Sequence, residues 1–590
     1  MVEPRFRWLF PSPLEVDPAT QAIARDLGIS PRVSELLHRR GVTASELAGF
    51  VGAPADGLLD PWLLPDAAIF AERIARARTS GERVMVFGDF DADGLTGLAI
   101  LCRTFARLGI DALPYVPSRL DEGHGLSRAA IEAALAANIH LIVTVDCGTS
   151  SRDEIAEAVE RGVEVIVTDH HRVPPIMPPA LAIVNPQRDD SRYPHRRLAG
   201  SGVAFKLAQL LLAGEPGGPE AALDLADLAT IGSVADVATM LGENRSIARI
   251  GLQRLHAKPR VGLAALLRRA GVDPATADLE TVSFVIAPRI NAAGRVGEAM
   301  DAARLLLTDD AAEADALAEL LDLANVERRA LTKGTVDEAE AAITAAVEVD
   351  AGPAILVHGP WPVGIVGLVA ARLAERNGRP AVVGADLGDV IRASCRSAAG
   401  FDLGAALEQC SDLLVRHGGH RAAAGFEIVA DNWPAFVARF QALAAAAVPS
   451  DSRAELHLDA ALPALEIDYA LVRDLAGLAP TGPGNPEPLV AVLGLTVTRI
   501  RAATGGHAQL TLRRRIDVLD GIAFNRADLM ESVHEGDRVD VVARLVSRTF
   551  GGYESIQLEV RDVAPSGSHP EARAILDGHA ATPALIGAAS

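Results

Sequence analysis

The chain has 590 residues, of which 49% are hydrophobic and 23% charged, and its formal net charge is −21 at pH 7. A chain of this length is too long for one hydrophobic core and, at about 150 residues per domain, predicts three or four domains. The acidic balance excludes a protein that binds polyanions over its whole surface, so any nucleic-acid site must be local.

The composition also predicts where the protein works. Residues 1–7 lack the apolar core of a secretion signal, and no uninterrupted apolar stretch is long enough to cross a bilayer. The four cysteines form no C-x-x-C pair, which excludes a paired-cysteine zinc site and a disulfide framework; they are Cys102, Cys147, Cys395 and Cys410. We therefore expect a cytoplasmic protein that makes no contact with membranes.

Residues 1–65 predict a small helical segment without recognisable chemistry, and residues 66–240 then alternate between apolar strands and amphipathic helices. The predicted strands are Val84–Phe87, Leu141–Val145, Val163–Thr168 and Leu181–Val184, and the helices between them include Leu95–Leu108 and Ser127–Ala137. This alternation is typical of an α/β domain with a doubly wound parallel sheet, in which ligands bind beyond the carboxyl ends of the strands.

Acidic or histidine side chains follow three of these predicted strands directly. They are Asp89, Asp91 and Asp93 after the first, Asp146 after the second, and Asp169, His170 and His171 after the third, with Asp236 after a later apolar run. Alone, the aspartate triplet is equally consistent with a solvated acidic turn. Together the four segments favour a metal site, because clustered carboxylates repel unless a cation lies among them, and their oxygens suit Mg²⁺ and Mn²⁺. Two metal ions about 3.5–4 Å apart can support phosphoryl displacement.

The same segments carry a family resemblance. In order, they resemble the motifs of the DHH phosphoesterase superfamily in its RecJ single-strand exonuclease form: Gly88–Gly94 (GDFDADG), Val145–Gly148 (VDCG), Asp169–His171 (DHH), Gly200–Lys206 (GSGVAFK) and Gly232–Asp236 (GSVAD). The resemblance makes residues 66–240 a DHH catalytic domain with two divalent ions, Mn²⁺ or Mg²⁺.

The resemblance also implies roles for individual residues. The metal ligands would be Asp91, Asp93, Asp146, His170 and Asp236, with Asp146 bridging the ions and Asp91 and Asp93 serving different ones. His171 would contact the scissile phosphate, which makes Asp146 and His171 the expected catalytic residues. Asp89 is either a further ligand or a residue that orients one.

Two features near this site leave alternatives open. The glycines of Gly200–Gly202 could seat a phosphate on backbone N–H groups at a helix start, or allow close packing of helix against strand, which we favour. Arg119 lies in a loop that faces the substrate in RecJ-like proteins, and it is either a phosphate ligand or an ordinary surface arginine.

Residues 241–350 predict a helical region that ends in a long connector helix, Ala311–Ala346. Pro288–Arg295 (PRINAAGR) interrupts the helical pattern and resembles a RecJ segment in which Arg289 and Asn291 reach toward the scissile phosphate.

A smaller α/β domain is predicted over residues 351–447. Arg392–Ser397 (RASCRS) and Gly418–Gly425 (GGHRAAAG) resemble the substrate-binding motifs of a DHHA1 domain. Ser394, Arg396 and His420 are therefore expected to bind phosphate, although a buried structural role for His420 is an alternative. Cys395 replaces the motif's central glycine, which puts a tight backbone approach at that position in doubt.

Residues 452–565 predict a small barrel of short strands, which the resemblance identifies as an OB-fold for single-stranded nucleic acid. Separate strands are predicted at Val490–Leu493 and Leu495–Ile500. Arginines make the segment locally basic, either to bind nucleic acid or as a solubilising face; they are Arg499, Arg501, Arg513, Arg514, Arg515, Arg544 and Arg548. Residues 566–590 are expected to be a flexible tail.

The resemblance implies metal-dependent hydrolysis of single-stranded DNA from the 5′ end, releasing 5′-mononucleotides, in DNA repair and recombination. A helicase and a single-strand-binding protein are the implied partners, and a monomer is expected. Two alternatives stay open: a DHH-family oligonucleotide phosphodiesterase or pyrophosphatase, and a non-catalytic single-strand-binding relative. The barrel argues against the first, and the intact acids and histidines argue against the second.

Overall fold

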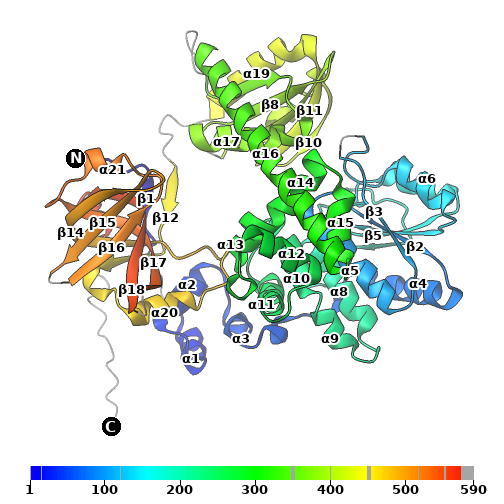
Figure 1. Ribbon diagram of the computed structural model, residues 1–590, viewed down its shortest axis with the longest axis horizontal. Coiled ribbons are helices and arrows are strands. Elements are labelled where there is room, and N and C mark those ends of the chain that lie inside the picture. Colours follow the sequence, from blue (N-terminus) through cyan, green and yellow to red (C-terminus); the bar gives the residue numbers. More distant parts are fainter. Residues whose placement is uncertain are drawn as a thin grey trace. The chain divides into compact units, whose positions relative to one another are not determined.

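The computed structural model describes residues 2–12, 14, 16–119, 121–346, 352–398, 400–447, 454–515, 517–550 and 553–572. The chain divides into two compact units, each taken by itself below: a larger unit of residues 52–450, and a barrel unit of residues 1–51 with 451–590 (Figure 1). Most of the expected tail, residues 573–590, lies outside the described residues.

A five-stranded parallel sheet organises the first half of the larger unit. Its strands, in spatial order, are β3 (Ala112–Tyr115), β2 (Val84–Gly88), β4 (Leu141–Val145), β5 (Glu164–Thr168) and β6 (Ala182–Val184). Helices cover both faces, namely α4 (Ala67–Ser80), α5 (Ala92–Arg107) and α8 (Gly200–Leu212) on one, and α6 (Arg128–Ala136) and α7 (Arg152–Glu160) on the other. Val84 and Val86 pack on the first side, while Met85 and Phe87 pack on the second, because successive strand residues point to opposite faces. The predicted doubly wound sheet is confirmed.

Helices then complete the core of this half. They are α9 (Gly218–Leu223), α10 (Ala226–Ala235), α11 (Gly242–Ala257), α12 (Val261–Ala270), α13 (Leu279–Thr281), α14 (Ala287–Val296) and α15 (Ala299–Leu307). The prediction that Pro288–Arg295 interrupts the helical pattern is wrong, because this segment forms α14. Pro288 lies in its first turn, directly after a π-helical turn over Val282–Ile286.

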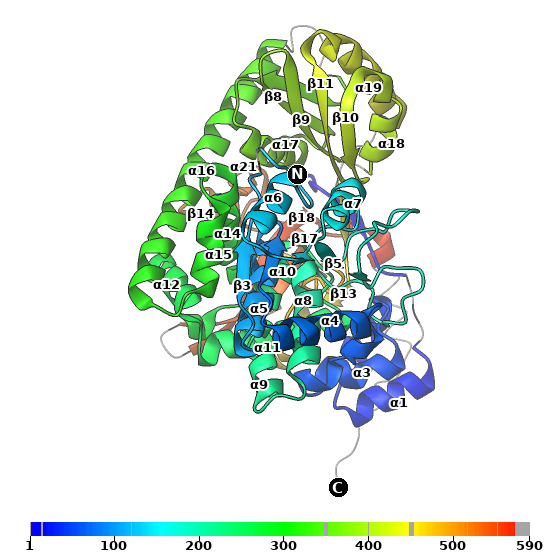
Figure 2. The same ribbon diagram turned by 90° about the vertical axis from the view of Figure 1, so that its right-hand side faces the viewer.

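The connector helix α16 (Ala311–Ala346) has the predicted bounds. Its 36 residues extend over about 54 Å. Leu317 and Leu321 belong to the core around the parallel sheet, whereas Val336 and Ala339 belong to the core of the next domain. Figure 2 shows this helix running beside both halves of the larger unit.

A mixed five-stranded sheet forms the second half of the larger unit. Its strands, in spatial order, are β10 (Leu414–Gly419), β11 (Ala423–Val429), β9 (Val390–Arg396), β8 (Ala381–Asp386) and β7 (Ile355–Gly359). Helix α17 (Val363–Asn377) packs on one face, and α18 (Leu403–Glu408) and α19 (Trp433–Ala447) pack on the other. Cys395 points into the second core and is fully buried, so its neighbours Ser394 and Arg396 face α17.

The barrel unit contains a closed five-stranded barrel, since β14 pairs with both β15 and β17. Its strands are β14 (Val490–Ala503), β15 (His507–Arg514), β16 (Asp517–Ala523), β17 (Arg538–Phe550) and β18 (Tyr553–Pro565), with β13 (Ala460–Pro463) added beside β14. The two strands predicted between Val490 and Ile500 are one strand: a register shift at Gly494, whose φ is +75°, lets β14 bend without ending.

The N-terminal residues pack onto this barrel. They form β1 (Arg7–Leu9), which pairs with β12 (Glu455–His457), followed by α1 (Pro18–Asp26), α2 (Pro31–Arg39) and α3 (Ala44–Val51); α20 (Tyr469–Ala476) and α21 (Leu529–Ser532) complete the unit. The buried Asp562 carboxylate anchors the N-terminal segment, because it accepts hydrogen bonds from Phe6 N–H (3.1 Å), Trp8 Nε1–H (2.8 Å) and Arg526 Nη1–H (3.2 Å).

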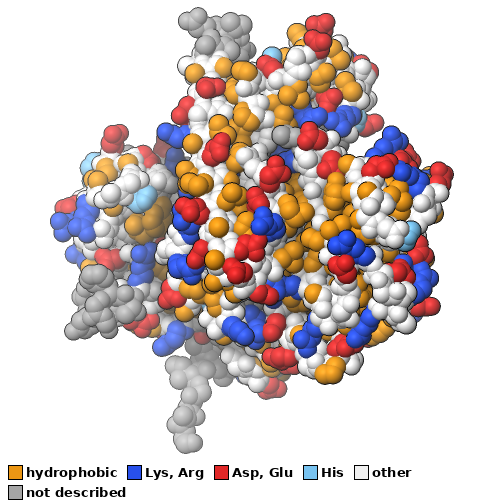
Figure 3. Space-filling model, turned by 45° about the vertical axis from the view of Figure 1, so that its right-hand side comes forward, with side chains coloured by type: hydrophobic (Ala, Val, Ile, Leu, Met, Phe, Trp, Pro, Cys, Tyr) orange, Lys and Arg blue, Asp and Glu red, His pale blue; other side chains and the backbone are white. Residues whose placement is uncertain are grey.

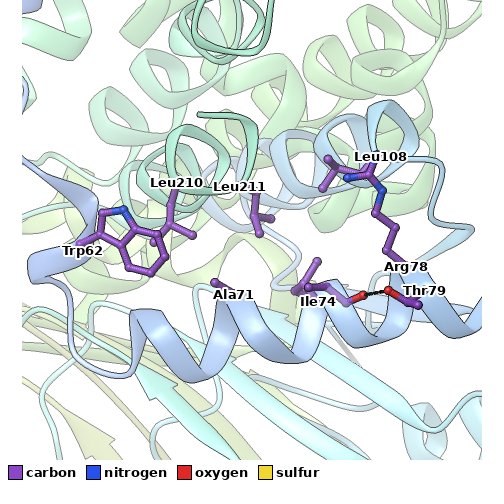
Figure 4. Close-up of a pocket in the computed structure, with 9 residues that line it drawn as sticks. Trp62, Ala71, Ile74, Arg78, Thr79, Leu108, Leu210 and Leu211 are labelled. Atoms are coloured by element: carbon purple, nitrogen blue, oxygen red, sulfur yellow. Dashed lines mark hydrogen bonds between the residues drawn. The ribbon is translucent and has the colours of Figure 1, made fainter. Parts of the chain in front are cut away.

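A surface pocket of ≈ 600 Å³ lies among α4, α5 and α8 (Figure 4). Trp62, Ile74, Leu108 and Leu210 are among its lining residues. Leu108 and Leu210 lie at the C-terminal ends of α5 and α8, whose N-terminal ends adjoin the acids described below. A 16-residue helix is about 24 Å long, so this apolar pocket is remote from those acids.

One face of the molecule shows how its charged side chains are distributed (Figure 3). On the face seen in Figure 3, acidic and basic side chains are interspersed. Among the described residues, no helix is both long enough and apolar enough to cross a membrane.

Candidate metal centre

The acids and histidines lie at the carboxyl ends of three adjacent strands. The sheet ladder continues into them, since Asp89 N–H donates to Val145 O (3.2 Å) and Asp146 N–H donates to Thr168 O (3.0 Å). Parallel pairing therefore aligns the residues after β2, β4 and β5 at one edge of the sheet, as the sequence predicts.

The turn after β2 is fixed by its own carboxylates. Asp91 caps α5 by accepting hydrogen bonds from Asp93 N–H (3.0 Å) and Gly94 N–H (3.1 Å). Asn291 from α14 accepts a hydrogen bond from Ala92 N–H (2.9 Å). The expected contact residue Asn291 thus supports the aspartate turn.

Asp93 ties this turn to the start of α8. Its two carboxylate oxygens accept hydrogen bonds from Gly200 N–H (2.6 Å) and Ser201 N–H (2.9 Å). A Cβ on Gly200 would lie 2.6 Å from Asp146 Cβ. Close packing therefore accounts for Gly200, in line with the favoured alternative, and the N–H groups of Gly200 and Ser201 are occupied by a carboxylate instead of a phosphate.

Three sets of side chains each place their ligand atoms within 4.8 Å of one another. They are Asp89, Asp91 and Asp146; Asp93, His170 and Asp236; and Asp146, His170 and His171. Asp146 belongs to two of the sets, and Asp89 joins Asp91. The structure therefore brings together every residue expected to be a ligand.

Asp146 and His170 carry the observation that best tests whether a cation fits. Asp146 Oδ1 and His170 Nε2 are 3.0 Å apart, yet the angles do not allow a hydrogen bond, and both buried atoms lack any hydrogen-bond partner among the described residues. Asp146 has a left-handed backbone with φ +62°. Two unpaired buried electron-pair donors aimed at a shared space suit a divalent cation.

The electrostatics of the cluster also favour a cation. Burial, reinforced by Asp89 and Asp93, raises the pKa of Asp91 to about 6. Burial, with Asp93 and Asp91 nearby, raises the pKa of Asp236 to about 8, and the pKa of Asp146 is also well above its usual range for these reasons. Carboxylates that repel one another this strongly are stabilised when a cation binds among them.

Asp169 positions the second histidine of the motif, a role that the sequence did not reveal. Its Oδ1 accepts hydrogen bonds from His171 N–H (3.1 Å) and from His171 Nδ1–H (2.8 Å), and its Oδ2 accepts one from Thr149 N–H (3.0 Å). Burial alone would raise the pKa of Asp169, but the His171 hydrogen bond and the charges of both histidines hold it well below its usual range. The same hydrogen bond raises the pKa of His171 to about 9, so its half-exposed ring is cationic at neutral pH.

Two arginines, Arg119 and Arg295, lie close enough to Asp91 to feel its charge. The Arg119 guanidinium lies 4.3 Å from the centre of the Phe90 ring, and the nearby charges of Asp91 and Asp89 favour its cationic form although burial lowers its pKa. Burial lowers the pKa of Arg295 to about 9, helped by the charges of Arg119, Arg328 and Arg396. Arg119 is therefore no ordinary surface arginine, and Arg295 is a candidate that the sequence prediction missed.

Arg289 does not have the predicted orientation. Its Nε–H donates to Asp322 Oδ1 (2.9 Å) on α16 and its Nη1–H donates to Val285 O (2.9 Å), so its guanidinium is engaged within the helical region. His420 is exposed, which excludes the buried structural alternative. Its backbone N–H closes the β10–β11 turn by donating to Ala423 O (2.8 Å).

His124 also adjoins the acids and was not predicted as a site residue. Its Nδ1 lies 3.0 Å from Asp89 Oδ2, and its ring centre is 4.4 Å from that of Phe90. The signal in the sequence, a histidine between two glycines in a loop after a strand, is too common to have identified it.

Three family models match the chain. They are the DHH family N-terminal domain over residues 83–233, the DHHA1 domain over 346–446 and the RecJ OB domain over 458–562. The first match agrees with the strand-end acids, and together the matches define a DHH-type phosphoesterase fold with a DHHA1 domain.

Characterised relatives resemble the chain over most of its length. It is 33% identical over 572 residues to the single-stranded-DNA-specific exonuclease RecJ of Bacillus subtilis (strain 168), which covers 96% of this chain and 72% of that protein. It is 38% identical over 500 residues to the Thermus thermophilus protein of the same name, with 85% and 71% covered. A crystal structure of RecJ in complex with Mn²⁺ from Thermus thermophilus superposes with a TM-score of 0.80 at 34% identity, covering 96% of this chain and 80% of that one. The Mg²⁺ complex gives 0.74 at 32% identity. The chain belongs to the RecJ family.

Gly200→Ala is predicted to damage the centre through packing alone. The added methyl would collide with the Cβ and backbone of Asp146, and the start of α8 cannot move away without breaking its hydrogen bonds to Asp93. We expect a loss of about 1–3 kcal/mol in unfolding free energy and about tenfold weaker Mn²⁺ binding, measured by thermal melting and calorimetry. Gly202→Ala is the matched control, because its methyl would meet only the Leu198 side chain at 3.4 Å. Equal behaviour of the two variants would contradict this account.

Proposed function

We propose that this chain is a metal-dependent exonuclease that hydrolyses single-stranded DNA from the 5′ end and releases 5′-mononucleotides. The observation that most supports this proposal is that Asp146 Oδ1 and His170 Nε2 are both buried without a hydrogen-bond partner among the described residues. They lie within a cluster of acids at the strand ends. The family and its Mn²⁺ and Mg²⁺ complexes support a divalent cation, and the three ligand sets support two ions. The 5′ polarity and the mononucleotide product are part of the proposal and rest on the resemblance alone.

Two of the ligand sets would each hold one metal ion. Asp89, Asp91 and Asp146 would hold one ion, while Asp93, His170 and Asp236 would hold the other, with Asp146 shared between them. When bound, such ions activate a water molecule and stabilise the leaving oxygen of a phosphoryl displacement.

The remaining groups bind the substrate. The His171 imidazolium, held by Asp169, is placed to donate a hydrogen bond to a non-bridging phosphate oxygen. Arg119, Arg295 and Arg396, whose charges interact with one another, would bind the phosphates of the strand, since a planar guanidinium binds phosphate in a bidentate manner. Ser394 lies beside Arg396 on β9, within 3.4 Å of the position that a Cβ on Gly367 would occupy, and belongs to the same proposed surface. We also propose His420 as a phosphate contact, because it is exposed in the turn between β10 and β11.

One gel assay tests the proposal. The protein is incubated with 5′- and 3′-labelled single-stranded and duplex DNA in the presence of Mn²⁺, Mg²⁺ or a chelator. We expect release of the 5′ label as a mononucleotide from the single strand only, and only with metal. Attack from the 3′ end would refute the polarity, equal digestion of the duplex would refute the strand preference, and activity in the chelator would refute the metal requirement.

The barrel is proposed to extend the strand-binding surface, and its arginines are not equivalent. Arg544 pairs with Glu487 and Arg548 with Glu559, while Arg514 donates to Ala464 O (2.8 Å). Arg499 and Arg513 are exposed, and among the described residues no acidic side chain forms an ion pair with either. These two are the proposed phosphate contacts.

Replacing both Arg499 and Arg513 by alanine is predicted to weaken binding of a long single strand by about tenfold and to lower the slope of log affinity against log salt by about 1.4. Hydrolysis of a dinucleotide should stay within about twofold, because so short a substrate does not need the barrel. Binding is measured by fluorescence anisotropy at several salt concentrations. Arg548→Ala, which removes an already paired arginine, is the control. If the variant lost the same fraction of its activity on long and short substrates, the barrel would have a structural role and would not bind the strand.

The setting of this activity is also a proposal. Four free, buried cysteines support a reducing, cytoplasmic location. An enzyme restricted to single strands needs DNA that has been unwound, which fits work beside a helicase and a single-strand-binding protein in repair and recombination. We further propose that the chain acts as a monomer.

A further inference from the structure

Val237, the residue after Asp236, has a backbone conformation that β-branched residues rarely adopt. Its φ is +60°, where Cβ approaches the following carbonyl oxygen and a branched side chain is strained. Among the described residues, six non-glycine residues have positive φ: Asp66, Asn138, Asp146, Val237, Arg515 and Asn525. Val237 is the only β-branched one of these.

The strain arises in a helix-ending motif that normally contains glycine. At the end of α10, Val237 N–H donates to Val234 O (3.2 Å) and Ala238 N–H donates to Ser233 O (2.9 Å), which is a Schellman motif. Among the described residues, the same pair of hydrogen bonds closes five other helices with glycine at the left-handed position: Gly28, Gly41, Gly109, Gly162 and Gly271. Asn138 takes that position at the end of α6. These six helix ends use glycine or asparagine, whereas the one beside the metal centre uses valine.

The Val237 side chain is largely exposed, so it adds little to the packing of the fold. Its side chain is 67% exposed. The backbone around it is held by other groups, since Thr239 O accepts a hydrogen bond from the Nδ2–H of the buried Asn244 (3.1 Å), in addition to the two hydrogen bonds of the motif. A strained residue that persists without a packing benefit is a mark of a functional position.

The position of Val237 suggests what the function is. Its neighbour Asp236 places Oδ2 3.8 Å from His170 Nδ1, within the ligand set that includes Asp93. Val237 is thus an exposed apolar residue that directly follows a member of a strongly charged cluster in the chain. If the phosphate of a nucleotide binds at the cluster, its oxygens would bind His171 and the arginines. Only the sugar and base of that nucleotide would then pack against an alkyl group.

We propose that Val237 is a substrate contact: the nucleoside part of the nucleotide at the metal centre packs against its side chain and is thereby aligned for hydrolysis. This role rests on the proposed exonuclease function and adds to it an apolar determinant beside the charged ones. It accounts for a valine at a position where the other helices with this motif have glycine or asparagine.

Three substitutions in the full-length chain separate this role from a structural one. V237G and V237N relieve the strain and remove the apolar group, whereas V237I keeps both. We expect V237G and V237N to melt at or above the wild-type temperature, to bind Mn²⁺ with unchanged affinity, and to lose about tenfold in kcat/KM on a single-stranded oligonucleotide. V237I should keep kcat/KM within about twofold. N138G, which makes the matching change at the end of α6, should raise the melting temperature without altering activity.

Each contrary outcome has a definite meaning. Unchanged kcat/KM in V237G and V237N would overturn the proposal. Lower melting temperatures in both variants would show that the valine is kept for stability, and weaker Mn²⁺ binding would show that it shapes Asp236; either result also overturns it. A wild-type protein that fails to digest single-stranded DNA with Mn²⁺ or Mg²⁺ would instead refute the proposed function.

Discussion

An Asp146→Asn protein is expected to lose on the order of 10³-fold in activity on single-stranded DNA, and yet to be more stable than the wild type when both are free of metal at pH 8. Activity falls because the carboxylate shared by two ligand sets becomes a neutral amide, which is a poor ligand for Mn²⁺ or Mg²⁺. Asparagine also tolerates the left-handed backbone that Asp146 adopts, so the substitution does not strain the chain.

The gain in stability follows from the raised pKa of Asp146. A carboxyl group whose pKa is higher in the folded than in the unfolded protein contributes stability below its ordinary pKa, and that contribution is lost as pH rises through the folded value. At pH 4 the metal-free variant and wild type should therefore melt at similar temperatures. As pH rises toward 8, Asp91 (pKa about 6) and Asp236 (pKa about 8) ionise in both proteins, but Asp146 ionises only in the wild type, which should therefore lose more stability than the variant.

Added Mn²⁺ should reverse this order. Binding to the folded state stabilises the wild type in proportion to its affinity, while the variant gains much less. Thermal melting at pH 4 and pH 8, with chelator and with Mn²⁺, measures all four conditions. Asp227→Asn is a useful control, because Asp227 is also a buried carboxylate but pairs with Arg260 at 2.9 Å away from the cluster. It should lose stability and keep activity. A wild type that remains the more stable protein at pH 8 without metal would contradict the interpretation of the acid cluster.

The sequence alone was sufficient for the parts of the site that depend on topology. Parallel strands bring the residues after their carboxyl ends to one edge, so Asp91, Asp146 and His170 could be grouped without coordinates. The connector helix was equally predictable, because alanine, leucine and glutamate dominate its 36 residues and none of them is proline.

The parts that depend on helical phase could not be predicted. Pro288–Arg295 was interpreted as a break in the helical region, so no face could be assigned to its arginines. In the observed helix α14, Arg289 and Arg295 are six residues and about 120° apart, and only Arg295 comes near Asp91 and Arg119. Arg289 instead meets Asp322, which is 33 residues away in the chain. Pairings of this kind depend on packing between helices and leave no local signal.

His171→Ala is expected to lower kcat on single-stranded DNA by about 10²–10³-fold while leaving Mn²⁺ affinity within about threefold of wild type. The imidazolium would stabilise charge on the phosphate in the transition state, so its removal affects catalysis more than binding. Calorimetric titration with Mn²⁺ distinguishes this role from that of a metal ligand. If His171 were chiefly a ligand, as its place in the set with Asp146 and His170 would allow, affinity would fall with activity.

Asp169→Asn should reproduce part of this loss with a characteristic pH dependence. The asparagine amide can still accept a hydrogen bond from a backbone N–H, but it no longer offers His171 the negative charge that raises its pKa to about 9. The His171 pKa in the variant should fall toward the ordinary value of about 6.5. The alkaline limb of the pH–kcat profile should therefore move to lower pH, so that the variant is most active near about pH 6 and loses more activity than wild type above about pH 7.

The two variants together test how the histidine acts. His171→Ala should have a low kcat without this shifted alkaline limb, because no titrating imidazole remains at the position. A double variant, Asp169→Asn with His171→Ala, should be little worse than His171→Ala alone if Asp169 acts through the histidine. Losses that multiply would mean that Asp169 has a separate role, such as fixing the backbone after β5 through its hydrogen bond with Thr149 N–H.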